Sequence, residues 1–198
     1  ETWLTADNYQ KAASAVIDWL VARDDVDGEK IGAMGMSMGS RWGVQVGAAD
    51  KRVKAVVGQM ANVGNFDIIF EQAQPNFKRI FMYMTGYTDE DAFDEHMKSH
   101  DYLPDVAKQL TVPHLLVAGD MDELCTPQDI ETFRGNLAGP SELWLYEGIF
   151  HPMGEVSAEI YPAMADWMQT TLNEGRPAGY KHTAYIEEGT TIAEHEHG

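Results

Sequence analysis

The segment IGAMGMSMGS, residues 31–40, places a single serine between two methionines and two glycines. The apolar run before Ser37 is typical of a short buried strand, and residues 38–48 after it are predicted to form a helix. A strand, the pattern Gly-x-Ser-x-Gly and a helix together predict a nucleophile elbow, a turn so sharp that the serine backbone is strained. We expect Gly35 and Gly39 to keep other side chains out of this turn, so that the Ser37 hydroxyl stands clear.

The predicted helix after the serine has two further features. Its N-terminal N–H groups point toward the serine and favour negative charge that develops there. Gly39, Gly43 and Gly47 recur at every fourth position and form one face of the helix. Three positions without side chains are expected to let this helix approach the sheet closely.

Short apolar segments alternate with helical segments along much of the chain. This alternation predicts an α/β fold, a mostly parallel sheet covered by helices on both faces. The further predicted strands are KAVVGQM (54–60), VPHLLVAG (112–119) and ELWLYEG (142–148), and the further predicted helices span residues 7–22, 128–136 and 158–172.

The first predicted helix can be capped by Thr5 or Asp7. Apolar side chains recur along it at helical spacing and give it an apolar face. The residues of this face are Tyr9, Ala12, Ala13, Val16, Trp19 and Leu20.

Two segments depart from the alternating pattern. Residues 62–105 are rich in aromatic residues and methionine and contain no clear strand, which we interpret as a helical cap insertion over one end of the sheet. Ordinary core-facing helices are the alternative. From Gly175 the chain loses its periodicity, which predicts an arm or a partly ordered tail. The expected organisation is a core of residues 1–62 and 106–174, a cap of residues 63–105 and a tail of residues 175–198.

The overall composition limits the classes of function. The chain has 198 residues, 44% of them hydrophobic, which is a globular composition with enough length for one sizeable core. Its 32 acidic and 14 basic residues give a net charge of −18, so we expect no nucleic-acid partner. No apolar run reaches membrane-spanning length, so no membrane partner is expected. A single cysteine, Cys125, excludes an internal disulfide and favours a reducing, cytoplasmic compartment.

A serine nucleophile needs a base, and the base needs an orienting acid. In this architecture the acid and then a histidine follow the serine along the chain. Asp122 lies in a Gly-x-x-Asp turn after one predicted strand, and His151 lies in the loop after the next. Three strand ends therefore deliver Ser37, Asp122 and His151 to one edge of the sheet.

These motifs resemble the α/β-hydrolase superfamily from about residue 7 to residue 172. The resemblance is strongest to its esterase, dienelactone-hydrolase and prolyl-oligopeptidase-like branches. Those branches share a helix leading into a run like VDGEKIGAMGMSMGS, the Gly-x-x-Asp turn and a late histidine. The insertion also resembles the cap of polyketide-trimming and pseudooxynicotine-type C–C hydrolases.

The resemblance implies a role for each matching residue. Ser37 would be the nucleophile, His151 the base and Asp122 the acid that orients it. The backbone N–H of Met38 would donate to the oxyanion. Ser40 stands where many members have a further glycine, which puts no catalytic role in doubt.

The front of the chain departs from the family pattern. Members build several strands before the elbow, and a loop after one of them supplies a second oxyanion N–H. This sequence has a single helix before the elbow strand. We therefore expect the carboxyl-terminal part of a longer hydrolase, with the missing N-terminal segment on the same or a separate chain, or else a truncated fold. A homo-oligomer is a further expectation.

Several residues compete for the acid role or for a separate reactivity. Asp120 directly follows the last glycine of its strand and competes with Asp122, and Glu123 is a lesser competitor. Cys125 near the triad is either a reactive thiol or, as is common for a lone cysteine, a small buried apolar residue.

The remaining histidines offer weak metal-binding patterns. His96 and His100 have the i, i+4 spacing of zinc ligands on a helix, but no third ligand stands out, and a solvated helix face is the alternative. His195 and His197 form either a weak metal site or a disordered end. His114 lies within an apolar strand and is expected to be packed there. We expect no metal and no cofactor.

The predicted function is a serine hydrolase with an acyl-enzyme intermediate. The substrate would be a medium-sized apolar or aromatic ester, or a ketone cleaved at a C–C bond next to the carbonyl. The alternative is a non-catalytic member of the same fold that binds a small molecule or a partner. The residues expected to line the substrate pocket, or else to be core, are Met36, Phe66, Phe70, Phe77 and Phe81.

Overall fold

The fold is built on a five-stranded parallel sheet, and the computed structural model describes residues 8–99 and 103–197. The strands lie side by side in the order of the chain, β1-β2-β3-β4-β5, and each pairs with the next in parallel. Their bounds are Ile31–Met36 for β1, Val53–Gln59 for β2, His114–Gly119 for β3, Ser141–Tyr146 for β4 and Lys181–Ile186 for β5.

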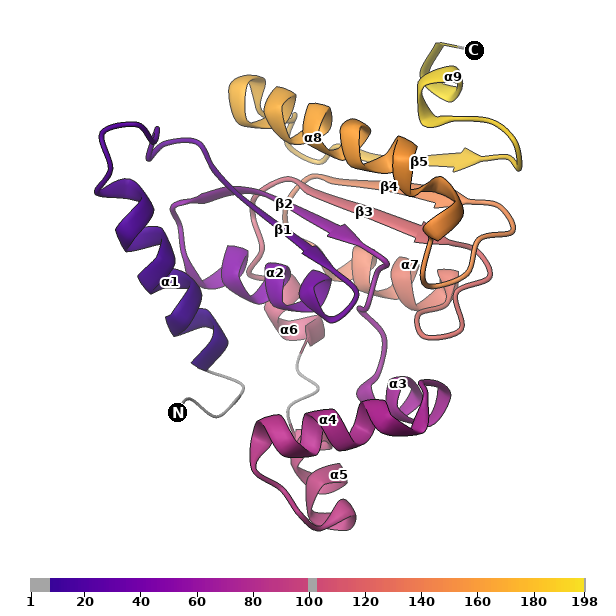
Figure 1. Ribbon diagram of the computed structural model, residues 1–198. Coiled ribbons are helices and arrows are strands. Elements are labelled where there is room, and N and C mark those ends of the chain that lie inside the picture. The colour runs from indigo at the N-terminus through magenta and orange to yellow at the C-terminus, as the bar shows by residue number, and fades with distance from the viewer. Residues whose placement is uncertain (1–7, 100–102, 198) are drawn as a thin grey trace.

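Helices cover both faces of this sheet, which confirms the α/β architecture expected from the sequence (Figure 1). One face carries α2 (Met38–Ala49), α6 (Leu103–Ala107) and α7 (Pro127–Asn136). The other face carries α8 (Ser157–Glu174), which follows a short 3-10 helix. None of the helices in residues 8–99 and 103–197 is both long and apolar enough to cross a membrane.

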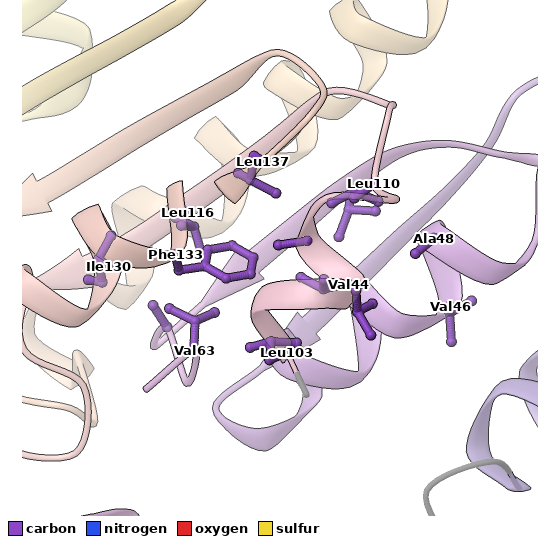
Figure 2. Packing of buried hydrophobic residues seen from close by; sticks show 14 of the residues in the cluster. Val44, Val46, Ala48, Val63, Leu103, Leu110, Leu116, Ile130, Phe133 and Leu137 are labelled. Atoms are coloured by element: carbon purple, nitrogen blue, oxygen red, sulfur yellow. The ribbon is translucent and has the colours of Figure 1, made fainter. Parts of the chain in front are cut away.

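The hydrophobic core is divided by the sheet because successive strand side chains point to opposite faces. Leu115 faces the α8 side, where it joins Trp144 and Trp167, whereas Leu116 faces the α2 side. Figure 2 shows this second cluster, in which α2, α6 and α7 pack against β2 and β3. Its labelled members are Val44, Val46, Ala48, Val63, Leu103, Leu110, Leu116, Ile130, Phe133 and Leu137.

The glycine face predicted for α2 is only partly needed for packing. A Cβ atom at Gly47 would lie 2.6 Å from the Val56 side chain, so a glycine is required for this close approach to β2. A Cβ at Gly43 would meet the same valine at 3.4 Å. A Cβ at Gly39 meets nothing within 4 Å, so the prediction that Gly39 belongs to this packing face is wrong. The first turn of the helix is nevertheless close to the sheet, through the backbone of Gly39 and the side chain of Ser40.

The segment between β2 and β3 forms three helices with a hydrophobic cluster of their own. They are α3 (Phe66–Gln72), α4 (Pro75–Thr85) and α5 (Glu90–Ser99). An ion pair between Lys78 and Asp94, 2.8 Å apart, joins α4 to α5. Figure 1 shows this group beyond α2, away from α8. Val63 and Leu103, near the two ends of the expected insertion, pack in the main core instead.

The carboxyl-terminal part contains regular elements that the sequence analysis did not predict. Strand β5 pairs with β4 over its whole length, and α9 (Ile192–His197) follows it. The expectation of an arm or a partly ordered tail did not include these elements. Only Ala184 and Ile186 of β5 are buried, so the strand has a weak apolar pattern in the sequence.

The side of the molecule next to β1 exposes several large apolar residues. Within the described residues β1 pairs only with β2, so its outer edge has no strand partner. On the predicted apolar face of α1 (Asn8–Val21), Val16 and Trp19 are 57% and 60% exposed. On β1 itself, Met34 and Met36 are 50% and 51% exposed. An unpaired apolar strand edge is a template for association with a further strand.

We expect a further strand, from the same polypeptide or a separate chain, to cover the outer edge of β1. The isolated chain of residues 1–198 should then self-associate through this edge, and Met34→Glu should reduce the association by placing a charge there. Sedimentation velocity over a range of concentrations measures this. Glu29→Gln, at an exposed position just before the strand, is the control. A wild-type chain that stays monomeric over this concentration range would contradict the expectation.

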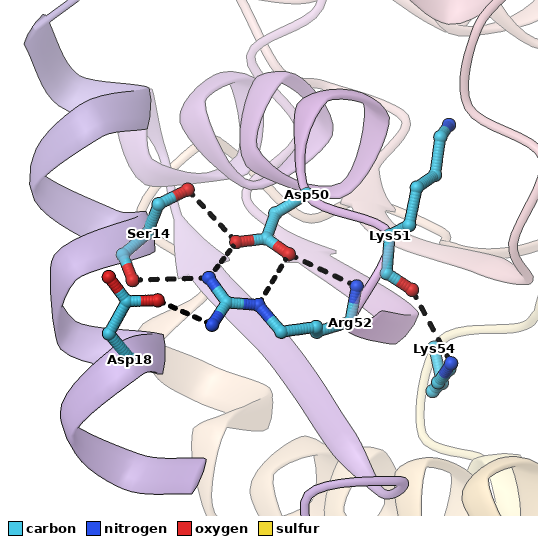
Figure 3. A network of polar contacts seen from close by, with 6 residues as sticks. All are labelled: Ser14, Asp18, Asp50, Lys51, Arg52 and Lys54. Atoms are coloured by element: carbon cyan, nitrogen blue, oxygen red, sulfur yellow. Dashed lines mark hydrogen bonds and ion pairs between the residues drawn. The ribbon is translucent and has the colours of Figure 1, made fainter. Parts of the chain in front are cut away.

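A polar network fastens α1 to the turn between α2 and β2 (Figure 3). The Arg52 guanidinium donates to Asp50 at 2.6 and 2.9 Å and to Asp18 of α1 at 2.5 Å. Ser14 of α1 donates to Oδ2 of Asp50 at 2.9 Å, an oxygen that also accepts from Arg52. The hydrogen bonds from Arg52 hold the pKa of Asp50 well below its usual range. The Asp50 carboxylate is thus the point at which α1 and the turn are joined.

Arg52→Gln should loosen α1 without unfolding the sheet. The amides of α1 should exchange hydrogen faster, whereas those of β2 and β3 should be unchanged. Lys108→Gln is the control, because the Lys108 ammonium pairs with Asp105 of its own turn at the surface. Because the pKa of Asp50 is lower in the folded state, its contribution is present above the unfolded value of about 4 and is lost as the pH falls further. The difference between Arg52→Gln and the wild type should shrink in the same pH range.

Candidate active site

The turn after β1 has the geometry expected of a nucleophile elbow. Ser37 has φ 51° and ψ −121°, a conformation that residues with side chains rarely adopt. Its N–H donates to the carbonyl oxygen of Gln59, at the end of β2, over 2.8 Å. A Cβ at Gly35 would lie 2.0 Å from the carbonyl oxygen of Gly39, so only glycine fits there. A side chain at Gly39, by contrast, would not crowd the turn, because a Cβ atom there would point into open space.

Three polar side chains from separate strand ends are joined by hydrogen bonds at this edge. The Ser37 Oγ lies 2.7 Å from Nε2 of His151. Nδ1 of the same imidazole lies 2.8 Å from Oδ2 of Asp122. Both distances fall within the range expected for a nucleophile, its base and an orienting acid. The order along the chain is serine, aspartate and histidine.

The carboxylate of Asp122 is held by the backbone of its own loop. Its Oδ1 accepts hydrogen bonds from the N–H groups of Leu124 at 2.8 Å and Cys125 at 3.1 Å. The side chain is fully buried, and that of His151 is nearly so. A carboxylate fixed on one oxygen presents the other in a single direction, which orients the imidazole toward Ser37.

The competing acids point elsewhere. Asp120 accepts hydrogen bonds from the N–H of Gly148 and from the Tyr185 hydroxyl of β5, each at 2.8 Å. The bond to Asp120 raises the pKa of Tyr185 to about 12. Glu123 is exposed at the surface. Asp120 therefore serves to tie the β3 turn to the β4 turn and β5.

Cys125 is a buried thiol beneath the site. Its sulfur accepts a hydrogen bond from the Val63 N–H at 3.4 Å. Burial raises the pKa of the Cys125 thiol to about 12, and the nearby negative charge of Asp122 acts in the same direction. A thiol with this pKa is almost entirely protonated at neutral pH, which favours the interpretation as a packed apolar residue.

A thiol-directed reagent should therefore leave the native chain unlabelled. Iodoacetamide is expected to modify Cys125 only after denaturation, and mass spectrometry of the intact chain measures the modification. The folded chain should stay unmodified up to pH 9, because the thiolate fraction is small throughout. Rapid stoichiometric labelling of the folded chain at pH 7 would show that the thiol is reactive after all.

The other histidines form no metal site in the described residues. His114 is fully buried in β3, with its ring 5.7 Å from that of Phe133. Burial lowers its pKa to about 3, with the charge of Arg134 as a lesser cause, so it is neutral and packed as expected. Residues 8–99 and 103–197 contain no cluster of three metal-binding side chains. His100, the second half of the proposed His96 pair, lies outside the described residues.

The residues predicted to line a substrate pocket have different environments. Met36 is exposed next to the serine, and the Tyr161 hydroxyl of α8 donates to its sulfur at 3.5 Å. The four phenylalanines pack against one another in the cluster of the helical segment, together with Met38. Phe70 has a central position, with ring centroids 5.3–6.0 Å from its neighbours. The buried members of this set are Phe66 and Phe81, and the partly exposed members are Phe70 and Phe77.

Backbone strain is concentrated around the same site. Three non-glycine residues of the described chain have positive φ, namely Ser37, Met60 and Met153. Met60 directly follows β2 and Met153 lies in the loop just after His151. A positive φ at a non-glycine residue costs free energy that neighbouring contacts must offset. Such residues tend to cluster at functional sites. No sequence pattern predicts a positive φ at either methionine.

Comparison with known proteins bears on the family and the fold. A family profile described as the prolyl oligopeptidase family matches residues 4–175. A 2,6-dihydroxy-pseudo-oxynicotine hydrolase is similar with a TM-score of 0.80 and 20% identity, over 91% of this chain and 51% of its own. An acetyl xylan esterase from Paenibacillus sp. R4 is similar with a TM-score of 0.60 and 20% identity, over 83% of this chain and 51% of its own. A puromycin-hydrolyzing peptidase from Mycobacterium tuberculosis is similar with a TM-score of 0.68 and 19% identity, over 88% of this chain and 27% of its own.

The parallel sheet, the elbow and the order of the polar residues define an α/β-hydrolase fold. The profile covers most of the sequence, and the chain therefore belongs to the prolyl oligopeptidase family. The chain spans about half the length of the first two of these structures. No curated protein sequence matches it.

Proposed function

We propose that the chain carries the nucleophile, base and acid of a serine hydrolase. The observation that supports this most directly is the continuous hydrogen-bonded series from Ser37 through His151 to Asp122, at 2.7 and 2.8 Å. A serine in a strained elbow is held in a single orientation, which lowers the entropic cost of attack. Membership of the prolyl oligopeptidase family agrees with this chemistry.

Each residue then has a defined step. His151 Nε2 takes the proton of Ser37 Oγ as the oxygen attacks the substrate carbonyl and forms a C–O bond. The tetrahedral intermediate collapses, the bond to the leaving group breaks, and the leaving group receives the proton from His151. Water repeats the sequence on the acyl-enzyme, releasing the acid and regenerating Ser37. Asp122 stays ionised and stabilises the imidazolium.

The oxyanion is proposed to form at the N-terminus of α2. The first N–H groups of a helix have no acceptor within the helix, and that of Met38 directly follows the nucleophile. One such donor contributes about 3–4 kcal/mol to transition-state stabilisation in a comparable site. The second donor is expected from a segment that lies across the outer edge of β1.

The proposed substrate is an ester or a ketone of medium size with an apolar or aromatic group. The similar structures include a 2,6-dihydroxy-pseudo-oxynicotine hydrolase and two acetyl xylan esterases, which supports hydrolysis without choosing the bond that is cleaved. The aromatic cluster of α3–α5, which contacts the first turns of α2 through Met38 and Trp42, is the proposed source of apolar specificity. A non-catalytic binding protein is the alternative, but such proteins usually lack a member of the triad.

Ser37→Ala should abolish turnover in the natural polypeptide that contains this chain. The loss is expected to be on the order of a million-fold or somewhat less, because the members of a triad act as one unit. Hydrolysis of p-nitrophenyl esters and labelling by a fluorophosphonate probe both measure it. Ser157→Ala is the control, because that serine makes only a local hydrogen bond at the start of α8. Activity of the Ser37→Ala protein within about tenfold of the wild type would remove Ser37 from the mechanism.

A further inference from the structure

The first turn of α2 is bonded to the loop that leads from β2 into the helical segment. Ser40, three residues after the elbow serine, is completely buried. Its Oγ donates to the carbonyl oxygen of Ser37 at 2.7 Å and accepts a hydrogen bond from the Asn62 N–H at 2.8 Å. A single hydroxyl thus joins the backbone of the elbow to the loop. The glycine common at this position in the superfamily has no side chain for either bond.

The next residue, Arg41, contacts the same loop further along. It is also buried, and its guanidinium donates to the carbonyl oxygen of Gly64. The guanidinium carbon lies 4.0 Å from the centroid of the Phe66 ring. A planar guanidinium suits this pair of contacts, because one edge donates hydrogen bonds while the face stacks on an aromatic ring. Phe66 is the first residue of α3.

Together the two side chains contact the loop at three alternate positions. Asn62 is bonded to Ser40, and Gly64 and Phe66 are contacted by Arg41. Phe66 in turn packs in the same cluster as Met38, the residue that follows the nucleophile. The elbow and the base of the helical segment are therefore held as one unit by contacts within a single turn of α2.

We propose that Ser40 and Arg41 are positioning residues with separable effects on the proposed hydrolase. Ser40 fixes the carbonyl of the elbow and so sets the orientation of the Ser37 hydroxyl and the Met38 N–H. Arg41 fixes the start of α3 and so sets where the aromatic cluster lies relative to the serine. Ser40 acts on the reactivity toward every substrate, and Arg41 acts on the recognition of bulky apolar groups. This inference rests on the proposed function.

The experiment compares two esters and one probe in the natural polypeptide that contains this chain. Ser40→Ala and Arg41→Met remove the contacts, and Arg41→Lys retains the charge without the planar group. For each variant, kcat and KM are measured with p-nitrophenyl acetate and with a p-nitrophenyl ester of a bulky aryl acid. The rate of labelling by a fluorophosphonate and the Tm are measured in parallel.

Ser40→Ala should lower kcat for both esters and the labelling rate together. The expected loss is about 10- to 100-fold, the scale that small misplacements of reacting groups produce, with KM unchanged. The hydroxyl is small, so the variant is expected to fold, and its Tm reports whether it does. A kcat and a labelling rate within twofold of the wild type would overturn the role of Ser40.

Arg41→Met should instead raise KM for the bulky ester about tenfold and leave kcat for the acetate within about threefold, since the serine itself stays oriented. Arg41→Lys should give an intermediate KM, because it retains a donor for Gly64 but not the face that stacks on Phe66. Equal effects on both esters would overturn the role of Arg41 in recognition.

Arg134→Met is the matched control for a buried arginine with a purely structural role. Arg134 donates to Glu131, Thr183 and the carbonyl oxygen of His182, and so joins α7 to β5 away from the elbow. It should lower the Tm without changing KM or the labelling rate. If Arg41→Met and Arg134→Met change stability and kinetics alike, the inference fails. If instead Ser37→Ala retains activity, the proposed function itself fails, so the two failures are distinguishable.

Discussion

The fold around the site depends on the contact between the backbones of Gly35 and Gly39. Any side chain at Gly35 would overlap the carbonyl group of Gly39, because its Cβ atom would lie 2.0 Å from the carbonyl oxygen. This approach accompanies the strained conformation of Ser37, with positive φ and ψ of −121°, so the strand ends and α2 begins within one residue. The free energy that this turn costs is offset by contacts around it, including the hydrogen bond from Ser37 to Gln59 of β2. Ser37 is thus positioned by the backbone of two neighbouring strands.

Features that depend on local sequence patterns could be predicted. The elbow, the strands that end before Asp122 and His151 and the helices around them each have a short signal of glycine or apolar spacing. Because parallel strands all end at one edge, these signals sufficed to place the three polar residues together. The contacts of Ser40 and Arg41 could not be found in this way. They join residues more than twenty positions apart, and a buried serine or arginine has no sequence pattern that names its partner.

Strand β5 illustrates a second kind of limit. The chain moves across the sheet in the same direction from β1 to β2 and from β4 to β5. The helix that makes the first connection, α2, and the helix that makes the second, α8, nevertheless cover opposite faces of the sheet. The two crossovers are therefore of opposite hand, although about 98% of such connections are right-handed. Long-range contacts explain why the unusual path is stable. Arg134 bonds to Thr183, Asp120 bonds to Tyr185, and Ala184 and Ile186 enter the core beside Trp144.

Within the described residues, β1, the strand that ends before Ser37, lies at the edge of the sheet, which makes the two sides of the site unequal. On the inner side, β2 supplies hydrogen bonds along β1, and Ser40 adds a bond to the loop beyond β2. On the outer side, Met34 and Met36 face solvent in the described structure. A strand bonded on one side only opens more readily than a strand bonded on both, because fewer hydrogen bonds must break at once. The orientation of the serine is therefore fixed from within this chain, whereas the rigidity of the strand beneath it depends on what covers the outer edge.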